Sequence, residues 1–362
     1  MSLMSYITRR LPRLTSLVFS AGLAFGANHA LATPYSDFYL FGDSLSDTGN
    51  MQLVSGGAVP PAPYFNGRFT NGPNWADRFA AESGLFTSPQ TPLLPGSLLG
   101  NVGDNYAWGG ARTYGHSIPA LNSLARLSSQ VGAFASQHGG VADPNALYVV
   151  WIGANDMQDA IGAAVTSYQN ALIGGATVAA AQQTAMQDID SAVSLAITNI
   201  NSAIATLMLM GADEFLVANL PDLVLTPRLA PGGIFSQYAS MTFNNALLSL
   251  LQTRPGTAHL YDVYSAFNEV VANPAAYGFT NADAACYTGD DLTFVPGGPV
   301  CATPDAYVFW DTIHPSAATH ALIERGMVAA LSGTIPEPAS FALLAAGLFA
   351  IGGVRRGAPR QN

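Results

Sequence analysis

Short apolar segments separated by longer helical stretches constrain the fold of this 362-residue chain more than any other feature. The clearest apolar segment covers residues 147–152 and ends at Gly153. Shorter ones cover residues 38–41, 215–218, 259–261 and 307–310. Segments of this length without an alternating polar face are typical of strands that are buried on both sides. A sheet built from such strands needs helices on both faces.

Helical stretches lie between the apolar segments. Residues 178–210 are rich in alanine, contain no proline and repeat apolar residues at helical spacing, which predicts one long helix. We expect further helices from Trp75 onward and over residues 121–137, 235–253 and 316–331, the last with Ser316 as N-cap. Residues 50–74 and 274–305 are expected to form loops, and residues 160–181 helix and loop. The alternation predicts a three-layer α/β/α sandwich with a mainly parallel sheet.

Polar residues suited to catalysis follow several of the predicted strands. In parallel sheets, functional groups lie beyond the carboxyl ends of the strands. Ser44, Asn155 and the pair Asp311 and His314 occupy such positions. We therefore expect these side chains at one edge of the sheet.

These residue types fit acyl-transfer chemistry. Gly-Asp-Ser at residues 42–44 alone also makes an ordinary turn. A serine nucleophile needs a base and a carboxylate that orients the base, and Asp311 and His314 can supply both from one loop. The Asn155 amide and a backbone N–H in the Gly109–Gly110 pair can donate hydrogen bonds to an oxyanion, although Asn155 also suits an Asx turn.

Four segments resemble the four motif blocks of the GDSL/SGNH hydrolase family: residues 41–50, 105–111, 153–156 and 311–315. The resemblance covers almost all of residues 37–331. It implies that Ser44 is the nucleophile and a backbone donor, that His314 is the base and that Asp311 orients it. It also implies that Gly110, five residues after Asn105, and Asn155 complete the oxyanion hole, with Gly109 as the fallback for Gly110. Further implications are a flavodoxin-like strand order, no metal and no cofactor.

The sequence limits the class of substrate less than it limits the type of reaction. Residues 67–72 and Trp75 resemble the lipase/esterase branch, which implies hydrolysis of a carboxylic ester. A short-chain ester, a lipid and an acetylated extracellular polysaccharide all remain open, as does acyl transfer to an alcohol. A different class of protein, an inactive envelope-binding protein on the same scaffold, is disfavoured by the complete set of motif residues.

Other polar and aromatic residues near the motifs have structural interpretations. We expect Asp47 and Asp156 to hold loops by hydrogen bonds. His116 and His320 are expected to be structural or on the surface. Trp108 and Trp151 are expected in the core.

The N-terminal end has the layout of a secretory signal. Arg9, Arg10 and Arg13 precede an apolar run at residues 17–26, and Ala-Leu-Ala at residues 30–32 has the small-x-small pattern of a cleavage site. We therefore expect residues 1–32 to be a signal peptide that signal peptidase removes. A membrane anchor that is never cut is the alternative.

The C-terminal end also resembles a processing signal. Pro-Glu-Pro at residues 336–338, a mainly apolar stretch at residues 339–354, and then Arg355 and Arg356 resemble the PEP-CTERM sorting signal of Gram-negative bacteria. That resemblance implies an exosortase-type protease as partner and delivery to the cell envelope or the outside. A simple tail anchor is the alternative. Residues 33–334 then form the hydrolase domain and residues 335–362 the sorting signal.

Charge and cysteine usage fit an exported enzyme. Residues 33–335 contain seven arginines against 22 acidic residues, a balance of −15. This acidity argues against nucleic acid and anionic membrane surfaces as partners, and leaves transient membrane contact to the terminal segments. Cys286 and Cys301, the only cysteines, flank one loop, and a disulfide is expected there rather than a metal site.

Overall fold

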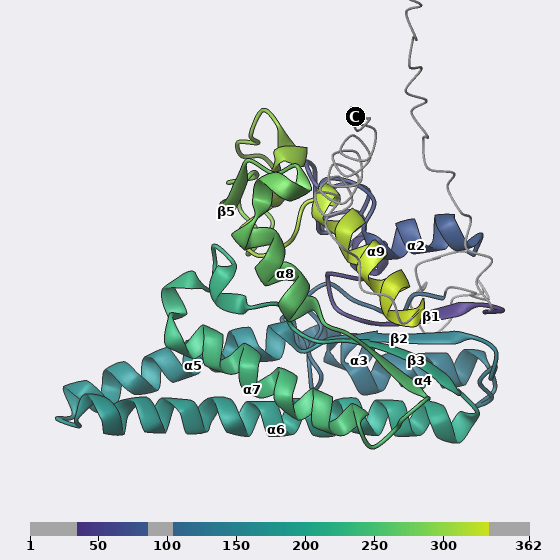
Figure 1. The fold of residues 1–362 in the computed structure, drawn as a ribbon, viewed down its shortest axis with the longest axis horizontal. Helices are drawn as coiled ribbons and strands as arrows, with labels where there is room; N and C mark the ends of the chain where they lie inside the picture. Colours follow the sequence, from purple (N-terminus) through teal and green to yellow (C-terminus); the bar gives the residue numbers. More distant parts are fainter. Residues whose placement is uncertain (1–34, 86–103, 333–362) are drawn as a thin grey trace, which may run out of the picture. The chain divides into compact units, whose positions relative to one another are not determined.

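The computed structural model describes residues 35–85 and 104–332, all within one unit of the chain. Four parallel strands form its main sheet in the order β1 (Phe38–Gly42), β2 (Leu147–Trp151), β3 (Glu214–Ala218) and β4 (Ala258–Tyr261) (Figure 1). In this sheet Phe38 pairs with Leu147, and Leu147 pairs with Glu214. The signal peptide and sorting signal expected from the sequence lie outside the described residues.

A fifth segment runs beside β1 without forming a regular strand. The Leu40 N–H donates to the Asp104 carbonyl at 3.0 Å, and the Tyr106 N–H donates to the Leu40 carbonyl at 2.7 Å. The resulting bridge between Leu40 and Asn105 is parallel. The segment at Asn105 follows β1 along the chain and lies beside β1 in the sheet, whereas β2, β3 and β4 follow on the other side of β1. This is the flavodoxin-like strand order that was expected.

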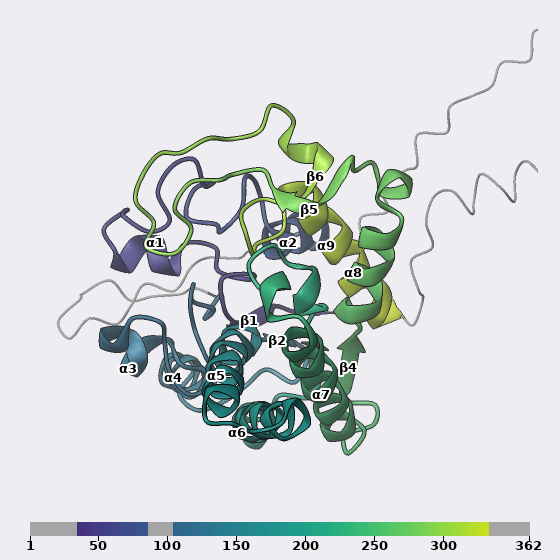
Figure 2. The same ribbon diagram turned by 90° about the vertical axis from the view of Figure 1, so that its left-hand side faces the viewer.

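Helices cover both faces of the sheet, which makes the predicted three-layer sandwich (Figures 1 and 2). One face carries α4 (Leu127–Gln137), α5 (Ala154–Ile173), α6 (Val178–Met210) and α7 (Ile234–Leu251). The other face carries α2 (Trp75–Ser83) and α9 (Ala317–Ser332). Trp108 belongs to the core of the first face and Trp151 to that of the second, as expected.

The long helix α6 has the bounds that its sequence predicts. Its length and apolar composition would also suit a membrane-spanning helix. Its buried residues, however, follow a single stripe at helical spacing that packs on α5 and α7, as in a core helix: Ala181, Ala185, Ile189, Val193, Ala196, Ile200, Ala203, Ile204 and Leu207. The α9 prediction is also confirmed, because Ser316 Oγ accepts the Thr319 N–H at 3.2 Å at its start.

Several expected elements differ in the structure, among them the loop expected at residues 274–305, which contains the strand β5 (Asn281–Ala285). The helix predicted over residues 121–137 is divided into α3 (Asn122–Ala125) and α4, because Arg126 takes an extended conformation with ψ 153°. Leu127 can then be fully buried while the Gln130 side chain reaches the Ala125 carbonyl. The expected loop at residues 50–74 contains the short helix α1 (Asn50–Val54).

The last predicted strand is not part of the main sheet. Residues 307–309 form β6 (Tyr307–Phe309), which pairs with β5 (Asn281–Ala285) in a separate two-stranded sheet. The expectation that Asp311 and His314 follow a strand of the main sheet was therefore wrong. The three-residue β6 pairs with β5, which belongs to the segment after α8 (Val263–Ala272). The Val308 carbonyl of β6 accepts hydrogen bonds from the Ser316 N–H and from Thr319 Oγ1.

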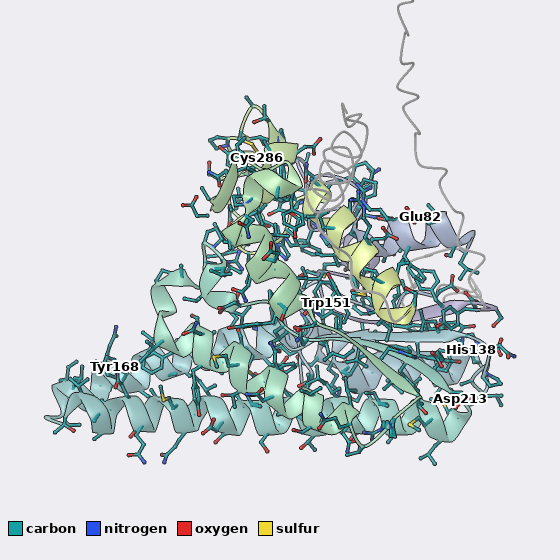
Figure 3. The ribbon with its side chains drawn as sticks, in the orientation of Figure 1. Glu82, His138, Trp151, Tyr168, Asp213 and Cys286 are labelled. Carbon is teal, nitrogen blue, oxygen red and sulfur yellow. A yellow bond between two sulfur atoms is a disulfide. The ribbon has the colours of Figure 1, made fainter. Side chains whose placement is uncertain are left out.

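The expected disulfide between Cys286 and Cys301 is present. It closes the loop that follows β5, and Figure 3 shows Cys286 in this part of the fold, away from the main sheet. The Cys286 N–H also donates to the Phe309 carbonyl, and the Tyr287 N–H to the Trp310 carbonyl. The disulfide loop is therefore fixed to the segment that leads into Asp311. Short 3-10 helices complete the described fold: η1 (Pro119–Leu121), η2 (Leu223–Leu225), η3 (Ala230–Gly232), η4 (Pro274–Tyr277) and η5 (Pro304–Ala306).

Candidate active site

Ser44 lies in a tight turn directly after β1. The turn is closed by the Ser46 N–H, which donates to the Asp43 carbonyl at 3.1 Å. Gly42 is needed at the end of the strand, because a Cβ there would come within 2.5 Å of the Trp151 carbonyl oxygen. Gln130 holds both sides of Gly42, since it accepts from the Gly42 N–H and donates to its carbonyl, each at 2.8 Å. The strand end that carries Ser44 is thus fixed from neighbouring elements.

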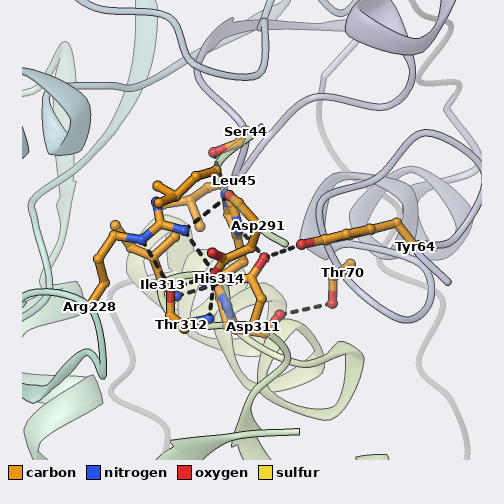
Figure 4. Close-up of polar contacts among 12 residues, drawn as sticks. Ser44, Leu45, Tyr64, Thr70, Arg228, Asp291, Asp311, Thr312, Ile313 and His314 are labelled. Carbon is orange, nitrogen blue, oxygen red and sulfur yellow. Dashed lines mark hydrogen bonds and ion pairs between the residues drawn. The ribbon is translucent and has the colours of Figure 1, made fainter. Parts of the chain in front are cut away.

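Ser44, His314 and Asp311 form a continuous hydrogen-bonded chain (Figure 4). Ser44 Oγ lies 2.8 Å from His314 Nε2, and His314 Nδ1 lies 2.6 Å from Asp311 Oδ2. Because the Asp311 carboxylate can only accept, Nδ1 carries the proton and Nε2 is left to accept from the serine hydroxyl. Ser44 is 270 positions away from His314 in sequence, so the fold alone brings them together.

The Asp311 carboxylate has a full set of donors although it is completely buried. Its Oδ1 accepts the backbone N–H groups of Ile313 and His314 at 2.9 and 2.6 Å. Burial raises the pKa of Asp311, but the charge of His314 and the hydrogen bonds from His314 and Ile313 outweigh it and leave the pKa below its ordinary value. The carboxylate is therefore held in its ionised form.

Residues that the sequence analysis did not identify support the hydrogen-bonded Ser44, His314 and Asp311. The Tyr64 hydroxyl donates to Asp311 Oδ2 at 2.8 Å (Figure 4). On the opposite side, Arg228 Nε donates to Thr312 Oγ1 at 3.0 Å, and Arg228 Nη2 forms an ion pair with Asp291 at 2.8 Å. Asp291 also accepts the Thr312 N–H at 2.9 Å. Because Asp291 belongs to the disulfide loop, that loop is tied to the segment between Asp311 and His314.

Three potential hydrogen-bond donors line the same cavity as Ser44. Within the described part of the chain, no group accepts from the backbone N–H of Ser44 or of Gly110. The Asn155 side chain donates one of its two amide protons to the Ala111 carbonyl at 3.0 Å, so the other remains for a ligand. The structure therefore brings Ser44, Gly110 and Asn155 to the same cavity.

Gly109, the alternative to Gly110, has its N–H already engaged. It donates to Asp47 Oδ2 at 2.8 Å. Asp47 also accepts the N–H groups of Gly49, Asn50 and Met51, which confirms that it holds a loop. Gly110 therefore fits the role of donor better than Gly109 does.

Three buried carboxyl groups lie near the site without an ion-pair partner among the described residues. Burial raises the pKa of Asp43 to about 7 and those of Asp47 and Asp156 to about 6. Asp156 accepts the Thr113 N–H at 3.0 Å and the Thr113 hydroxyl at 2.5 Å, which confirms its expected part in holding a loop. Asp43, whose carboxylate accepts the Leu45 N–H at 3.1 Å, differs from the other two because it lines the cavity.

The cavity beside Ser44 has a volume of about 410 Å³, and most of its lining residues are apolar. Leu223, Val263, Phe267 and Ile323 are among them and are almost fully buried. Trp151, also a lining residue, lies at the end of β2, opposite the end of the sheet marked by Asp213 (Figure 3). The cavity therefore opens at the carboxyl ends of the strands, as expected for this fold.

The disulfide loop forms one wall of this cavity through Asp291, Leu292, Thr293 and Phe294. Phe294 packs on Tyr64 and Phe69 at ring-centroid distances of 5.6 and 5.5 Å. The loop thus contributes to the wall of the cavity as well as to the support of Asp311. Sequence reasoning missed this role, because the composition of the segment is that of an ordinary surface loop.

The two other histidines considered from the sequence are buried rather than on the surface. His320 Nδ1 accepts the Trp75 N–H at 3.3 Å, and burial lowers the pKa of His320 to about 3. His116 lies behind the Gly109–Gly110 pair. A structural role is thus confirmed for His320.

A parallel α/β domain with a serine hydrogen-bonded to a histidine at the strand ends has the arrangement of a serine hydrolase. The family model of the GDSL-like lipase/acylhydrolases matches residues 38–325. The chain belongs to this family and is a serine hydrolase that acts on ester bonds. The model of the PEP-CTERM protein-sorting motif matches residues 334–356. This signal indicates export to the cell envelope of a Gram-negative bacterium, with processing by an exosortase.

Curated relatives are similar along most of their length. A GDSL esterase/lipase of Arabidopsis thaliana is 28% identical, over 80% of this chain and 85% of the relative. A phosphatidylcholine-sterol acyltransferase of Aeromonas hydrophila is 25% identical, over 80% of this chain and 88% of the relative. Among solved structures, a lipolytic protein of the G-D-S-L family from Veillonella parvula matches 81% of this chain and 96% of its own, with a TM-score of 0.41 and 10% identity.

Proposed function

We propose that this protein hydrolyses carboxylic esters through an acyl-enzyme formed on Ser44. The observation that carries the proposal is the chain of hydrogen bonds of 2.8 and 2.6 Å that joins Ser44 Oγ, His314 and Asp311. In the first step, Ser44 Oγ attacks the ester carbonyl carbon while His314 Nε2 takes its proton. The imidazolium that forms is stabilised by the ionised Asp311.

The negative charge of the tetrahedral intermediate needs donors that are in place before the reaction. The N–H groups of Ser44 and Gly110 and the free amide proton of Asn155 are assigned this role. His314 then returns the proton to the leaving alcohol, and the acyl group stays on Ser44. A water molecule, deprotonated by the same imidazole, attacks the acyl-enzyme and releases the acid.

The mature enzyme is proposed to comprise residues 33–334. On this proposal, signal peptidase removes residues 1–32, and the terminal segments account for transient contact with the membrane. The mature enzyme acts in the envelope or outside the cell and has no nucleic-acid partner. The mainly apolar cavity supports an ester with an apolar acyl or alcohol part, and leaves an O-acetylated polysaccharide as the less favoured substrate.

The direct test is hydrolysis of p-nitrophenyl esters of graded chain length by the purified mature protein, with Ser44→Ala as the control. Replacement of Ser44 is expected to lower kcat by about 10⁴-fold or more. A fluorophosphonate probe should label the wild type at Ser44 and leave the variant unlabelled. Wild-type turnover by Ser44→Ala would remove the assignment, and so would labelling at another residue.

Acyl transfer to an alcohol is a second candidate function. It is favoured by the similarity to the Aeromonas hydrophila protein that is named a phosphatidylcholine-sterol acyltransferase. The same acyl-enzyme would then be attacked by an alcohol in place of water. Product analysis in the presence of a competing alcohol separates the two, because a transferase forms the new ester in preference to the free acid.

A further inference from the structure

His116 lies behind the proposed oxyanion donor rather than in the substrate cavity. Its Nε2 lies 2.6 Å from the Gly109 carbonyl oxygen, and its Nδ1 accepts the Ile118 N–H at 2.9 Å. Because Nδ1 acts as the acceptor, the proton of the neutral ring is on Nε2, and His116 donates to Gly109. Burial lowers the pKa of His116, with Arg112 adding to the effect, which favours this neutral form.

The ring itself is held by a small hairpin. Ala111 and His116 form an antiparallel bridge, and the Ser117 N–H donates to the Gly110 carbonyl at 3.0 Å. The His116 N–H in turn donates to Asn122 Oδ1 at 2.6 Å. The backbone of His116 is thus held from both sides.

The bond to the Gly109 carbonyl determines where the Gly110 N–H points. The peptide between Gly109 and Gly110 is trans, since the cis peptides of the described residues precede Pro60 and Pro63. In a trans peptide the C=O and N–H bonds point in opposite directions. A carbonyl directed at His116 therefore directs the Gly110 N–H away from it, and Gly110 lines the cavity that contains Ser44.

Neither glycine can be replaced by a residue with a side chain without strain. Gly110 has φ +78°, and a Cβ there would overlap Ser117 Oγ. A Cβ on Gly109 would overlap the ring of Phe69. Two glycines in succession have a soft backbone, and a fixed hydrogen-bond donor to the Gly109 carbonyl restrains rotation of the peptide plane. The N–H of Gly109 is fixed by Asp47, and the carbonyl of Gly110 is also held by Arg112 at 3.0 Å.

From this geometry we infer that His116 is a positioning residue that fixes the Gly109–Gly110 peptide so that the Gly110 N–H is aimed at the oxyanion. The inference rests on the proposed function, because it assigns the Gly110 N–H to that oxyanion. His116 takes no proton from the substrate and does not touch it. Its contribution is realised in the transition state, where the negative charge on oxygen develops.

Two substitutions separate the orienting contact from the support of the hairpin. His116→Gln can place an amide N–H where Nε2 lies and so keeps the donor to the Gly109 carbonyl. His116→Asn is too short for that contact, but its amide oxygen can replace Nδ1 as acceptor for the Ile118 N–H. We expect kcat for a soluble p-nitrophenyl ester to fall about 10–100-fold in His116→Asn with KM within about twofold, and to stay within about fivefold in His116→Gln.

The turnover measurement includes only enzyme molecules whose serine is reactive. Turnover is expressed per serine titrated by a fluorophosphonate probe, so a smaller folded fraction does not lower kcat. Affinity for a boronic acid that forms a tetrahedral adduct with the serine should fall in His116→Asn in parallel with kcat. His259→Leu is the matched control, because His259 is a half-buried histidine of β4 bonded to Glu214, and kcat should not change.

Several outcomes would overturn the inference. These are wild-type kcat in His116→Asn, a larger loss in His116→Gln than in His116→Asn, an unchanged boronic acid affinity, or a variant without titratable serine. Ser44→Ala, measured in parallel, separates this failure from failure of the proposed function. If Ser44→Ala is inactive while His116→Asn is unimpaired, only the positioning role of His116 is wrong.

Discussion

The Tyr64 hydroxyl and His314 Nδ1 donate to the same carboxylate oxygen, Oδ2 of Asp311, at 2.8 and 2.6 Å. Tyr64 comes from the long segment between α1 and α2, whereas Asp311 and His314 come from the end of the domain. Burial and the adjacent Asp311 charge raise the pKa of Tyr64 well above its usual range, so it remains a donor at every working pH. Tyr64 therefore fixes the carboxylate that fixes the histidine.

Tyr64→Phe should weaken catalysis without abolishing it. The ring still fills its place among Phe69, Tyr287 and Trp310, but Asp311 Oδ2 loses one donor. We expect kcat to fall about tenfold and the free energy of unfolding to fall by about 1.5–3 kcal/mol, as for a hydrogen bond to a charged group. Kinetics and urea unfolding measure the two effects. Tyr168→Phe on α5, where the ring packs on Phe235, is the control and should change neither.

Asn155→Ala should lower kcat about 10²–10³-fold, because one of the proposed oxyanion donors is lost. The folded state should persist, since the substitution removes a single hydrogen bond to the Ala111 carbonyl. Asn268→Ala is a matched control, because Asn268 also donates to a backbone carbonyl, that of Tyr264. Equal kcat values for Asn155→Ala and Asn268→Ala would show that Asn155 is not an oxyanion donor.

Removal of the disulfide should reduce both stability and activity. The bond closes a loop over a sequence separation of 15, which corresponds to about 3 kcal/mol of stabilisation in the chain-entropy description. In the double variant Cys286→Ser and Cys301→Ser, kcat/KM should also fall, because Asp291 and Phe294 of the loop line the cavity. Urea unfolding with and without dithiothreitol provides the comparison. The reductant should destabilise the wild type and leave the variant unchanged, and a wild type indifferent to reduction would contradict this.

The buried Asp43 should make stability depend on pH. Its pKa rises from 3.8 to about 7 on folding, so between these values the native state holds a proton that the unfolded state has released. The free energy of unfolding therefore falls as pH rises from about 4 to about 7, with a slope of about 1.4 kcal/mol per pH unit inside that interval. Asp47 and Asp156 act in the same direction, and Asp311, with its lowered pKa, acts in the opposite one.

Asp43→Asn isolates the contribution of this one group. The stability of the variant relative to the wild type should increase steadily as pH rises from about 4 to about 7, and then level off. Chemical unfolding at a series of pH values measures the difference. A difference that stays constant over this interval would mean that the Asp43 carboxyl is ionised in the native protein throughout.

The sheet and its helices were predictable because local pattern and burial agree. Residues 147–151 are apolar on both faces and lie between two other strands, so nothing competes with their intrinsic preference. The stripe of buried apolar residues on α6 is equally easy to recognise in the sequence. The break between α3 and α4 at Arg126 could not be predicted in this way. It depends on tertiary contacts of the neighbouring residues, and the helical periodicity of the sequence carries no information about them.

The motif residues were predictable for a related reason, and their supports were not. Ser44, Asn155, Asp311 and His314 stand in short segments whose order is informative. Tyr64, by contrast, contacts a partner 247 positions away, and Arg228 contacts one 84 positions away. A lone tyrosine in a proline-rich loop and a lone arginine carry no local pattern, so only the folded chain reveals these contacts. The position of β6 escaped prediction likewise, because three apolar residues do not specify which strand they will pair with.

The link between the disulfide loop and the Asp311–His314 segment has a consequence for biosynthesis. A cysteine pair stays reduced in the cytoplasm and is oxidised only in the periplasm or beyond. Until then, Asp291 must hold Thr312 and Arg228 from a loop that lacks its covalent closure. The newly made enzyme should therefore reach full hydrolytic activity only after it has left the cytoplasm, which contains the cell's own ester-linked metabolites.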